Sequence, residues 1–309
     1  MYTLLFDRRH INLEYENQCL IIRSPETPPR SIPLSYIRKI ICLHSVQLTT
    51  ALLGQLWERG IDFINLNQRS SERSFALYPK QQQQVKRRCL QYSFQQNDAL
   101  SLPIAKAICT HRILGNLRTL KLSQNHHLSI HLYKKKDDLQ RCITKEQLRG
   151  VEGACQRLIF DFWRSLLPSD LNFQSRKRRP ALDPVNALLS LTYTLAMQEA
   201  IRQCTAHGLD SQLGVYHSIL SGRHSLACDL LEPIRPYCEQ WVMTSFLEET
   251  FTAKDFTKGS PCLLIKPARE RYYQAIAEQL KPWRRSLMAS ARWLCKHIDQ
   301  HSERNPYEH

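Results

Sequence analysis

Three short stretches of this chain combine acidic, imidazole and basic side chains that could assist chemistry at a metal ion. In the first, Glu152 precedes Gly153 within a segment of helical spacing, where a glycine costs about 1 kcal/mol relative to alanine. Close approach of another backbone, a metal ion or a phosphate would give that glycine a reason. A surface glutamate beside an incidental glycine is the alternative, and this stretch alone leaves both open.

The second and third stretches add an imidazole and two carboxylates. His217 follows a segment expected to be a helix-free turn, and a lone histidine is more often structural or exposed than a ligand. Asp229 and Glu232 are expected on one face of a helix, with Cβ atoms about 5–6 Å apart. Carboxylates this close repel each other unless a cation lies between them. Two exposed acids near a helix start are the alternative, since the helix dipole favours them there.

As a group, Glu152, His217, Asp229 and Glu232 form an oxygen-rich donor set with one imidazole. This set suits Mg²⁺ or Mn²⁺ better than a structural zinc. In phosphodiester chemistry such an ion stabilises charge on a non-bridging oxygen and helps to deprotonate a water or a 3′-hydroxyl. Spacing alone does not place the four residues together, so a shared metal site is a hypothesis at this point.

The charge balance indicates a polyanionic partner. The chain has 43 Lys and Arg against 28 Asp and Glu, a formal net charge of +15. Such an excess is typical of nucleic-acid-binding proteins, although charge alone does not separate DNA from RNA or from an anionic membrane. The candidate phosphate contacts are Lys86, Arg87, Arg88, Arg176, Lys177, Arg178, Arg179 and Arg223. Solvated charge is the alternative for each run, and Arg223, close after His217, is the strongest candidate.

The elements that must position these residues divide the chain into two parts. Residues 1–79 are expected to be strand-rich, with strands at 2–6, 19–23, 39–43 and 61–66 and prolines breaking the chain at 25, 28 and 29. One helix should begin at Thr49 or Thr50 and stop at Gly60. The polar stretch 79–84 marks a boundary. The predicted fold class is therefore α+β, with a small N-terminal β-rich domain (1–79) and a larger all-α catalytic domain (80–309).

Helical spacing and capping signals recur through the second part. Helices are predicted over 102–122, 144–167, 183–207, 225–249, 270–280 and 286–301, and the polar segment 125–141 is expected to be a solvated turn. Thr144 begins a sequence of capping-box form, Asp183 precedes a proline at the first helical position, and Ser225 can cap a further helix. Pro233 should kink or end that helix, because its ring clashes with the carbonyl of Asp229.

Cysteine usage and the N-terminus favour a cytoplasmic protein. The eleven cysteines form no C-x-x-C pair, so reduced thiols, mostly in the core, are expected. The first charges follow a short apolar run instead of preceding one, which differs from a secretory signal. No stretch has the length of a membrane span.

The order and wording of the motifs resemble one family, the CRISPR-associated integrase Cas1, the catalytic subunit of spacer acquisition. The matching motifs lie within residues 32–65, 104–116, 152–160, 179–193 and 208–230, nearly the whole chain. Each motif is weak by itself, whereas five in the right order are specific. Ile159 stands where the family usually has an aromatic residue, a change expected to affect packing only.

The resemblance implies a β-domain that supports dimerisation and a helical catalytic domain. It implies Mg²⁺ or Mn²⁺ held by Glu152, His217 and Asp229, with Glu232 as a fourth ligand or a supporting group. It also implies a homodimer that docks on a small ferredoxin-like Cas2 subunit and acts on double-stranded DNA, both the protospacer and the CRISPR leader-repeat. Some relatives are fused to, or work beside, a reverse transcriptase; no fusion is visible within this chain.

The implied reaction is attack of a DNA 3′-hydroxyl on a phosphodiester of the CRISPR array, which inserts a spacer for antiviral defence. Water in place of the hydroxyl gives endonuclease activity, and no Walker motif is present. Three alternatives remain: a nuclease of branched DNA that does not integrate, a nucleic-acid-binding scaffold with an inactive site, and a metal hydrolase of small molecules. The charge of +15 disfavours the last of these.

Overall fold

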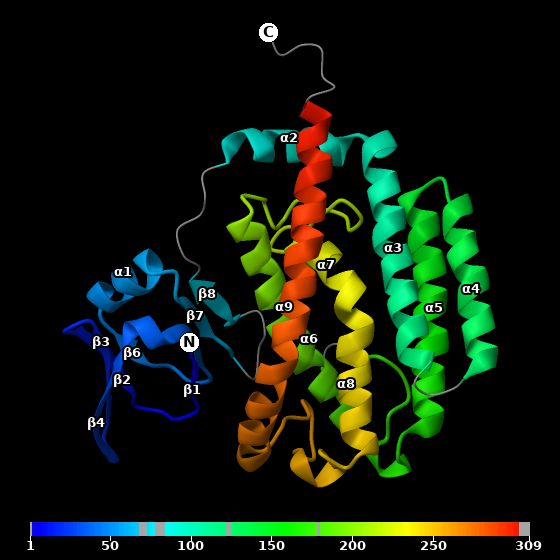
Figure 1. Ribbon diagram of the computed structural model, residues 1–309. Helices are drawn as coiled ribbons and strands as arrows, with labels where there is room; N and C mark the ends of the chain where they lie inside the picture. Colours follow the sequence, from blue (N-terminus) through cyan, green and yellow to red (C-terminus); the bar gives the residue numbers. More distant parts are fainter. Residues whose placement is uncertain (1, 68–72, 78–83, 122–124, 178–179, 303–309) are drawn as a thin grey trace. The chain divides into compact units, whose positions relative to one another are not determined.

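The computed structural model describes residues 2–67, 73–77, 84–121, 125–177 and 180–302. The chain divides into two compact units, Met1–Gln82 and Gln83–His309. The first unit is rich in strands and the second is mostly helical (Figure 1), which confirms the predicted α+β class. The predicted polar joint at 79–84 lies outside the described residues except for its last position.

Two four-stranded sheets build the first unit. One has the order β1-β5-β7-β8, with bounds Tyr2–Phe6, Ile37–Cys42, Asp62–Asn65 and Phe75–Leu77. Its first three strands are parallel and β8 is antiparallel. The other has the order β4-β3-β2-β6, with bounds Thr27–Pro33, Cys19–Ser24, Asn12–Glu16 and Gln47–Leu48. A 3₁₀ turn, Leu34–Tyr36, precedes β5.

The segment from β5 to β7 has the predicted strand, helix, strand order. Helix α1 (Thr50–Glu58) begins where the Thr49 side chain accepts a hydrogen bond from the Leu52 amide. The helix is followed by Gly60 at a φ of 72°, a value that glycine adopts readily. One prediction here is wrong: the prolines expected to break the chain lie beside or within β4. Because β4 is an edge strand of its sheet, a missing amide donor is tolerated there.

The second unit consists mostly of helices, joined by short turns and by longer loops such as 207–224 and 248–265 (Figure 1). The α-helices are α2 (Val85–Gln96), α3 (Asp98–Lys121), α4 (His126–Arg141), α5 (Lys145–Leu166), α6 (Pro184–Ala206), α7 (Ser225–Leu231), α8 (Arg235–Leu247) and α9 (Lys266–Ser302). Short 3₁₀ turns occur at Ser169–Leu171, η4 (Glu232–Ile234) and Ala253–Asp255. Helices α3, α4 and α5 pack side by side, and α6 packs against α7, α8 and α9. The active-site candidates lie on α5, on η4 and α7, and on the loop before α7.

Several helix ends follow their predicted signals. Thr144 accepts a hydrogen bond from the Gln147 amide at the start of α5, and Asp183 caps α6 ahead of Pro184. The capping box of α5 is only half formed, because the Gln147 side chain accepts from the Ile143 amide instead. As predicted from Pro233, α7 ends at this point and continues as η4.

Three helix predictions are wrong. The segment expected to be a turn is helix α4, whose buried side chains Leu128, Leu132 and Leu139 recur at helical spacing. The two predicted C-terminal helices form one continuous α9, because its buried stripe passes Pro282 without interruption. Ser225 is the first residue of α7 and does not cap it.

The cysteines are all free thiols, and most are buried, as the composition predicted. None of the described helices is both long and apolar enough to cross a membrane.

Candidate active site

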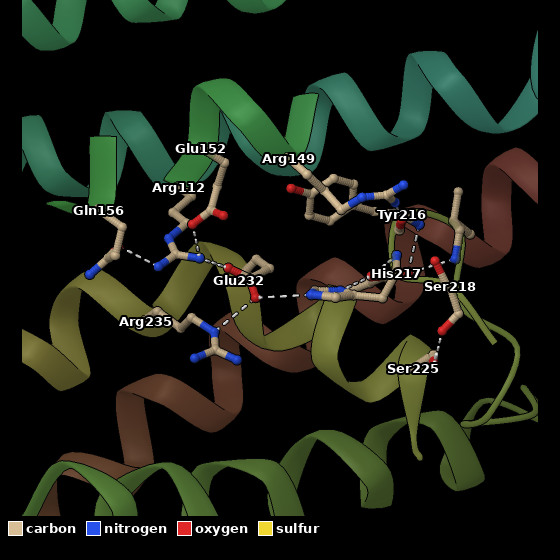
Figure 2. Close-up of polar contacts among 12 residues, drawn as sticks. Arg112, Arg149, Glu152, Gln156, Tyr216, His217, Ser218, Ser225, Glu232 and Arg235 are labelled. Atoms are coloured by element: carbon tan, nitrogen blue, oxygen red, sulfur yellow. Dashed lines mark hydrogen bonds and ion pairs between the residues drawn. The ribbon is translucent and has the colours of Figure 1, made fainter. Parts of the chain in front are cut away.

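Arg112 of α3 lies between carboxylates from two other elements (Figure 2). Its Nη1 atom is 2.5 Å from Oε1 of Glu152 on α5, and it also contacts Oε2 of Glu232 in η4. The guanidinium is buried. Gly115, one turn further along α3, lets this helix pack closely against the start of α8, since a Cβ there would lie 3.0 Å from Cγ of Pro236. Two acids separated widely in sequence therefore share one cation.

Glu232 is surrounded by positive groups. Besides Arg112, Nε of Arg235 lies 2.8 Å and Nε2 of His217 lies 3.7 Å from its Oε1 atom. Burial alone would raise the pKa of the Glu232 carboxyl, but the charges of Arg112, Arg235 and His217 outweigh it and lower the pKa to about 2. Glu232 is therefore ionised at neutral pH, in a position that is 3% exposed.

Asp229 has a different environment, although it lies only one turn before Glu232. Its carboxylate is completely buried. Oδ2 accepts hydrogen bonds from the amides of Val215 (2.6 Å) and Tyr216 (3.0 Å). Oδ1 accepts from the amide of His217 at 3.0 Å and lies 2.6 Å from its Nδ1 atom. Asp229 thus holds the loop and leaves Nε2 of His217 on the side of Glu232.

The loop that carries His217 is fixed at further points. Ser225 donates a hydrogen bond to the Ser218 carbonyl at 2.8 Å, and Arg149 donates to the Tyr216 carbonyl at 3.4 Å (Figure 2). A Cβ on Gly214 would lie 2.5 Å from the His217 carbonyl oxygen, so the turn needs glycine. The loop that carries the imidazole is therefore held by contacts from both α5 and α7.

A polar layer lies behind the two carboxylates. Nη2 of Arg112 contacts the Gln156 side chain and lies 3.7 Å from Oε1 of Glu239. That oxygen accepts a hydrogen bond from the Tyr193 hydroxyl at 2.5 Å. Within the described parts of the chain, the buried Oε2 atom of Glu239 has no hydrogen-bond partner. The charge on Arg235 lies 4.7 Å from the centre of the Tyr193 ring.

Arg112, Arg235 and Glu239 were missed as site residues by reasoning from sequence. Arg112 does carry a signal, because it falls one turn after buried Ile108 on the apolar face of α3. A cation at such a position needs a buried partner. For Gly153, where the sequence left two readings open, the described structure shows no close approach of another backbone. A Cβ there would meet only Nη1 of Arg157, at 4.0 Å.

The basic candidates differ in their surroundings. Arg87 forms a two-point ion pair with Asp299 and donates to the His207 carbonyl. Arg176 donates to Asn186 and Ser190 of α6, so both arginines already serve the fold. The remaining candidates sort by exposure: Lys86 and Lys177 are exposed, Arg88 and Arg223 are half-buried, and Arg178 and Arg179 lie outside the described residues.

The donor atoms fit a divalent ion, although they are not gathered around one. In the described part of the chain, no three His, Cys, Asp or Glu side chains lie close enough together to hold a metal. The Arg112 guanidinium stands between Glu152 and Glu232 instead. Even so, two carboxylates converge on one positive centre and an imidazole nitrogen lies beside them. These oxygen and nitrogen donors are of the kind that Mg²⁺ and Mn²⁺ accept.

The same fold is found in several solved structures. A solved structure described as a casposase bound to integration product aligns with a TM-score of 0.86 at 20% identity, over 97% of this chain and 91% of that chain. A Cas6-RT-Cas1–Cas2 complex aligns with a TM-score of 0.82 at 21% identity, over 97% of this chain and 35% of that chain. At these identities the likeness shows the fold.

Sequence comparison gives the family. The model of CRISPR associated protein Cas1 matches residues 4–278, so the chain belongs to the Cas1 family, as the motifs predicted. The CRISPR-associated endonuclease Cas1 1 of Thermodesulfovibrio yellowstonii is 28% identical over 316 residues, which cover 97% of this chain and 99% of the relative. A relative from Chlorobaculum tepidum, 28% identical over 82% of this chain and 78% of the relative, is likewise named CRISPR-associated endonuclease Cas1 1.

Proposed function

We propose that this protein is a DNA endonuclease and integrase that depends on Mg²⁺ or Mn²⁺. It inserts protospacer DNA into the CRISPR array by attack of a 3′-hydroxyl on a phosphodiester. The observation that carries the proposal is the convergence of Glu152 and Glu232 on one cation, with Nε2 of His217 3.7 Å from Glu232. The name of the Thermodesulfovibrio relative and the integration product in the casposase structure support this reaction class.

The ligand assignment follows from the surroundings of each acid. Glu152, His217 and Glu232 would hold the divalent ion, because each has a donor atom near the point where Arg112 now lies. When bound, the ion would stabilise charge on the phosphate and lower the pKa of the attacking hydroxyl. Asp229 is a positioning residue in this proposal, since both of its oxygens already accept hydrogen bonds from the loop. This reverses the ligand order expected from the resemblance, which favoured Asp229 over Glu232.

The protein's own residues prepare the site for this chemistry. Asp229 fixes the His217 ring through Nδ1, so that Nε2 is the ring nitrogen that would bind the ion. An outer carboxylate of this kind orients a ligand imidazole and sets its tautomer. Arg235 offsets the charge of Glu232. Water in place of the 3′-hydroxyl gives hydrolysis at the same site, so one constellation serves both cutting and joining.

We propose double-stranded DNA as the substrate, both as protospacer and as CRISPR leader-repeat. The net charge of +15 supports a polyanionic partner. Lys177 and Arg223 are the strongest phosphate contacts among the described candidates, because Lys177 is exposed, Arg223 is close to His217 in the chain, and Arg87 and Arg176 bind other residues of the fold. We also propose a homodimer formed through the N-terminal unit and docked on a Cas2 subunit. The Cas1–Cas2 and reverse transcriptase parts of one neighbouring complex support that kind of assembly.

The test is a strand-transfer assay. Purified protein, with and without its Cas2 partner, is incubated with a labelled short duplex and a supercoiled plasmid that carries a CRISPR array, in Mg²⁺ or Mn²⁺. Wild type, Glu152→Ala and His217→Ala are compared. The proposal expects label joined to the plasmid by wild type only. Cutting without joining would favour the branched-DNA nuclease, and equal behaviour of all three proteins would overturn the site assignment.

A further inference from the structure

The position of Arg112 is incompatible with a cation held by both acids. Its Nη1 atom lies 2.5 Å from Oε1 of Glu152 and contacts Oε2 of Glu232. An ion bound by these two oxygens would have to occupy nearly the same point. Two cations in one place repel strongly inside a protein, where the effective dielectric constant is far below that of water. Either the guanidinium or the divalent ion can therefore lie between these carboxylates, but not both.

The structure offers the guanidinium a second position. Nη2 of Arg112 already contacts Gln156 and lies 3.7 Å from Oε1 of Glu239, a distance too long for a good hydrogen bond. Glu239 is 1% exposed, and its Oε2 atom has no hydrogen-bond partner among the described residues. A buried carboxylate oxygen without a donor is costly. A small shift of Arg112 toward Glu239 would supply that donor.

We propose that Arg112 competes with the divalent ion for Glu152 and Glu232, and that Glu239 receives the guanidinium when the ion binds. The inference rests on the proposed metal site and concerns how that site is regulated. Arg112 keeps the two acids paired with a positive charge at low metal concentration, and it sets the concentration at which the ion replaces it. Glu239 makes the replacement possible because the arginine never has to enter an apolar core without a partner.

Arg235 provides a matched control. It is also a buried arginine paired with Glu232, with Nε 2.8 Å from Oε1. No contact between Arg235 and Glu152 is present in the described structure, so it does not stand between the two acids. Neutralising either arginine removes one positive charge near the site. Only the Arg112 substitution also clears the position that the ion needs.

The experiment measures Mn²⁺ affinity directly, from the electron paramagnetic resonance signal of free Mn²⁺ during titration. Wild type is compared with Arg112→Gln, Arg235→Gln, Glu239→Gln and the double variant of Arg112 and Glu239. We expect Arg112→Gln to bind Mn²⁺ about tenfold more tightly, a coupling of ordinary size for competing ligands. Arg235→Gln should give a clearly smaller gain. Glu239→Gln should weaken binding about tenfold in the wild-type background and have little effect beside Arg112→Gln.

The outcomes separate this inference from the proposed function. If wild type binds no Mn²⁺, or if Glu152→Ala binds it as tightly as wild type does, both the proposed function and this inference fail. If wild type binds in a Glu152-dependent way but Arg112→Gln does not bind more tightly than Arg235→Gln, only the competition is overturned. Arg112→Gln leaves buried acids without their cation and can fail to fold. In that case the isosteric Glu239→Gln decides, with its fold checked by circular dichroism, since unchanged Mn²⁺ affinity in this variant would overturn the role of Glu239 and with it the inference.

Discussion

The Nδ1 atom of His217 lies 2.6 Å from Oδ1 of Asp229, and the same oxygen accepts a hydrogen bond from the His217 amide. Asp229 therefore fixes both the ring and the backbone of the histidine. Its other oxygen accepts hydrogen bonds from two more amides of the loop, so both oxygens are already used to hold the loop. These contacts are the reason why Asp229 is proposed to position His217, whereas Glu232, one turn later, is proposed as a metal ligand.

Asp229→Asn should weaken the site without removing it. An amide nitrogen in place of either oxygen would face donors, because both oxygens accept backbone hydrogen bonds. We expect activity and Mn²⁺ affinity to fall about 10–100-fold, as for other residues that orient ligands, and the free energy of unfolding to fall by about 1–3 kcal/mol. Strand-transfer rates, Mn²⁺ titration and urea unfolding check this. Loss of Mn²⁺ binding as complete as in Glu152→Ala would instead make Asp229 a ligand.

Gly214→Ala should displace the histidine loop. The added Cβ would lie 2.5 Å from the His217 carbonyl oxygen and 2.8 Å from Cβ of Ser225, so backbone must move. We expect loss of most strand-transfer activity and about 1–3 kcal/mol of stability. Gly150→Ala is the control, because it lies within α5 with nothing within 4 Å of its new Cβ. That variant should be neutral or slightly stabilising, and equal effects of both would contradict the steric argument.

Local signals in the sequence were sufficient for many of the elements. Thr49, Thr144 and Asp183 marked helix starts because a capping side chain acts on amides within three residues. Pro233 marked the break at η4 because a proline ring also acts only on backbone groups within about one turn. Helix α4 was missed because its many charges obscured three buried leucines.

The arrangement of the site depends on contacts of long range, which spacing does not encode. Arg112 meets Glu152 and Glu232 only because α3 packs against α5 and η4. The different roles of Asp229 and Glu232 depend on which way each points from a broken helix. The motifs were enough to single out three acids and one histidine as candidates, whereas the bridging arginine required the packed structure.

Arg284→Met should destabilise the helical unit away from the site. Glu199 of α6 is completely buried, and Arg284 of α9 contacts both of its oxygens, at 2.9 and 3.3 Å. Removing Arg284 should cost about 1–3 kcal/mol, because the buried carboxylate of Glu199 loses these two contacts. Urea unfolding measures this loss. Combining it with Glu199→Leu should recover much of the stability, and additive losses in the double variant would argue against the pair.

Stability should rise with pH through the titration of His224. Burial lowers the pKa of this imidazole from 6.5, and the charge of Asp210 opposes the shift only in part. The unfolded chain therefore takes up a proton at a higher pH than the folded protein does. The free energy of unfolding contributed by His224 is fully present above pH 6.5 and is lost as the pH falls below it. His224→Gln should reduce this slope in urea unfolding between pH 5 and pH 8, and an unchanged slope would exclude His224 as its source.

Substitutions of Lys177 and Arg87 should have opposite effects, one on DNA binding and the other on stability. Lys177 is exposed, whereas Arg87 binds both oxygens of Asp299 and so joins α2 to α9. Lys177→Ala should reduce the slope of log affinity against log salt by about one, as expected for one lost phosphate contact, with stability unchanged. Arg87→Ala should leave that slope unchanged and lower the free energy of unfolding by about 1–3 kcal/mol. DNA binding titrated at several salt concentrations, with urea unfolding beside it, distinguishes the two. The reverse pattern would mean that Arg87 leaves its ion pair to contact DNA, and an unaffected slope in Lys177→Ala would remove residue 177 from the DNA path.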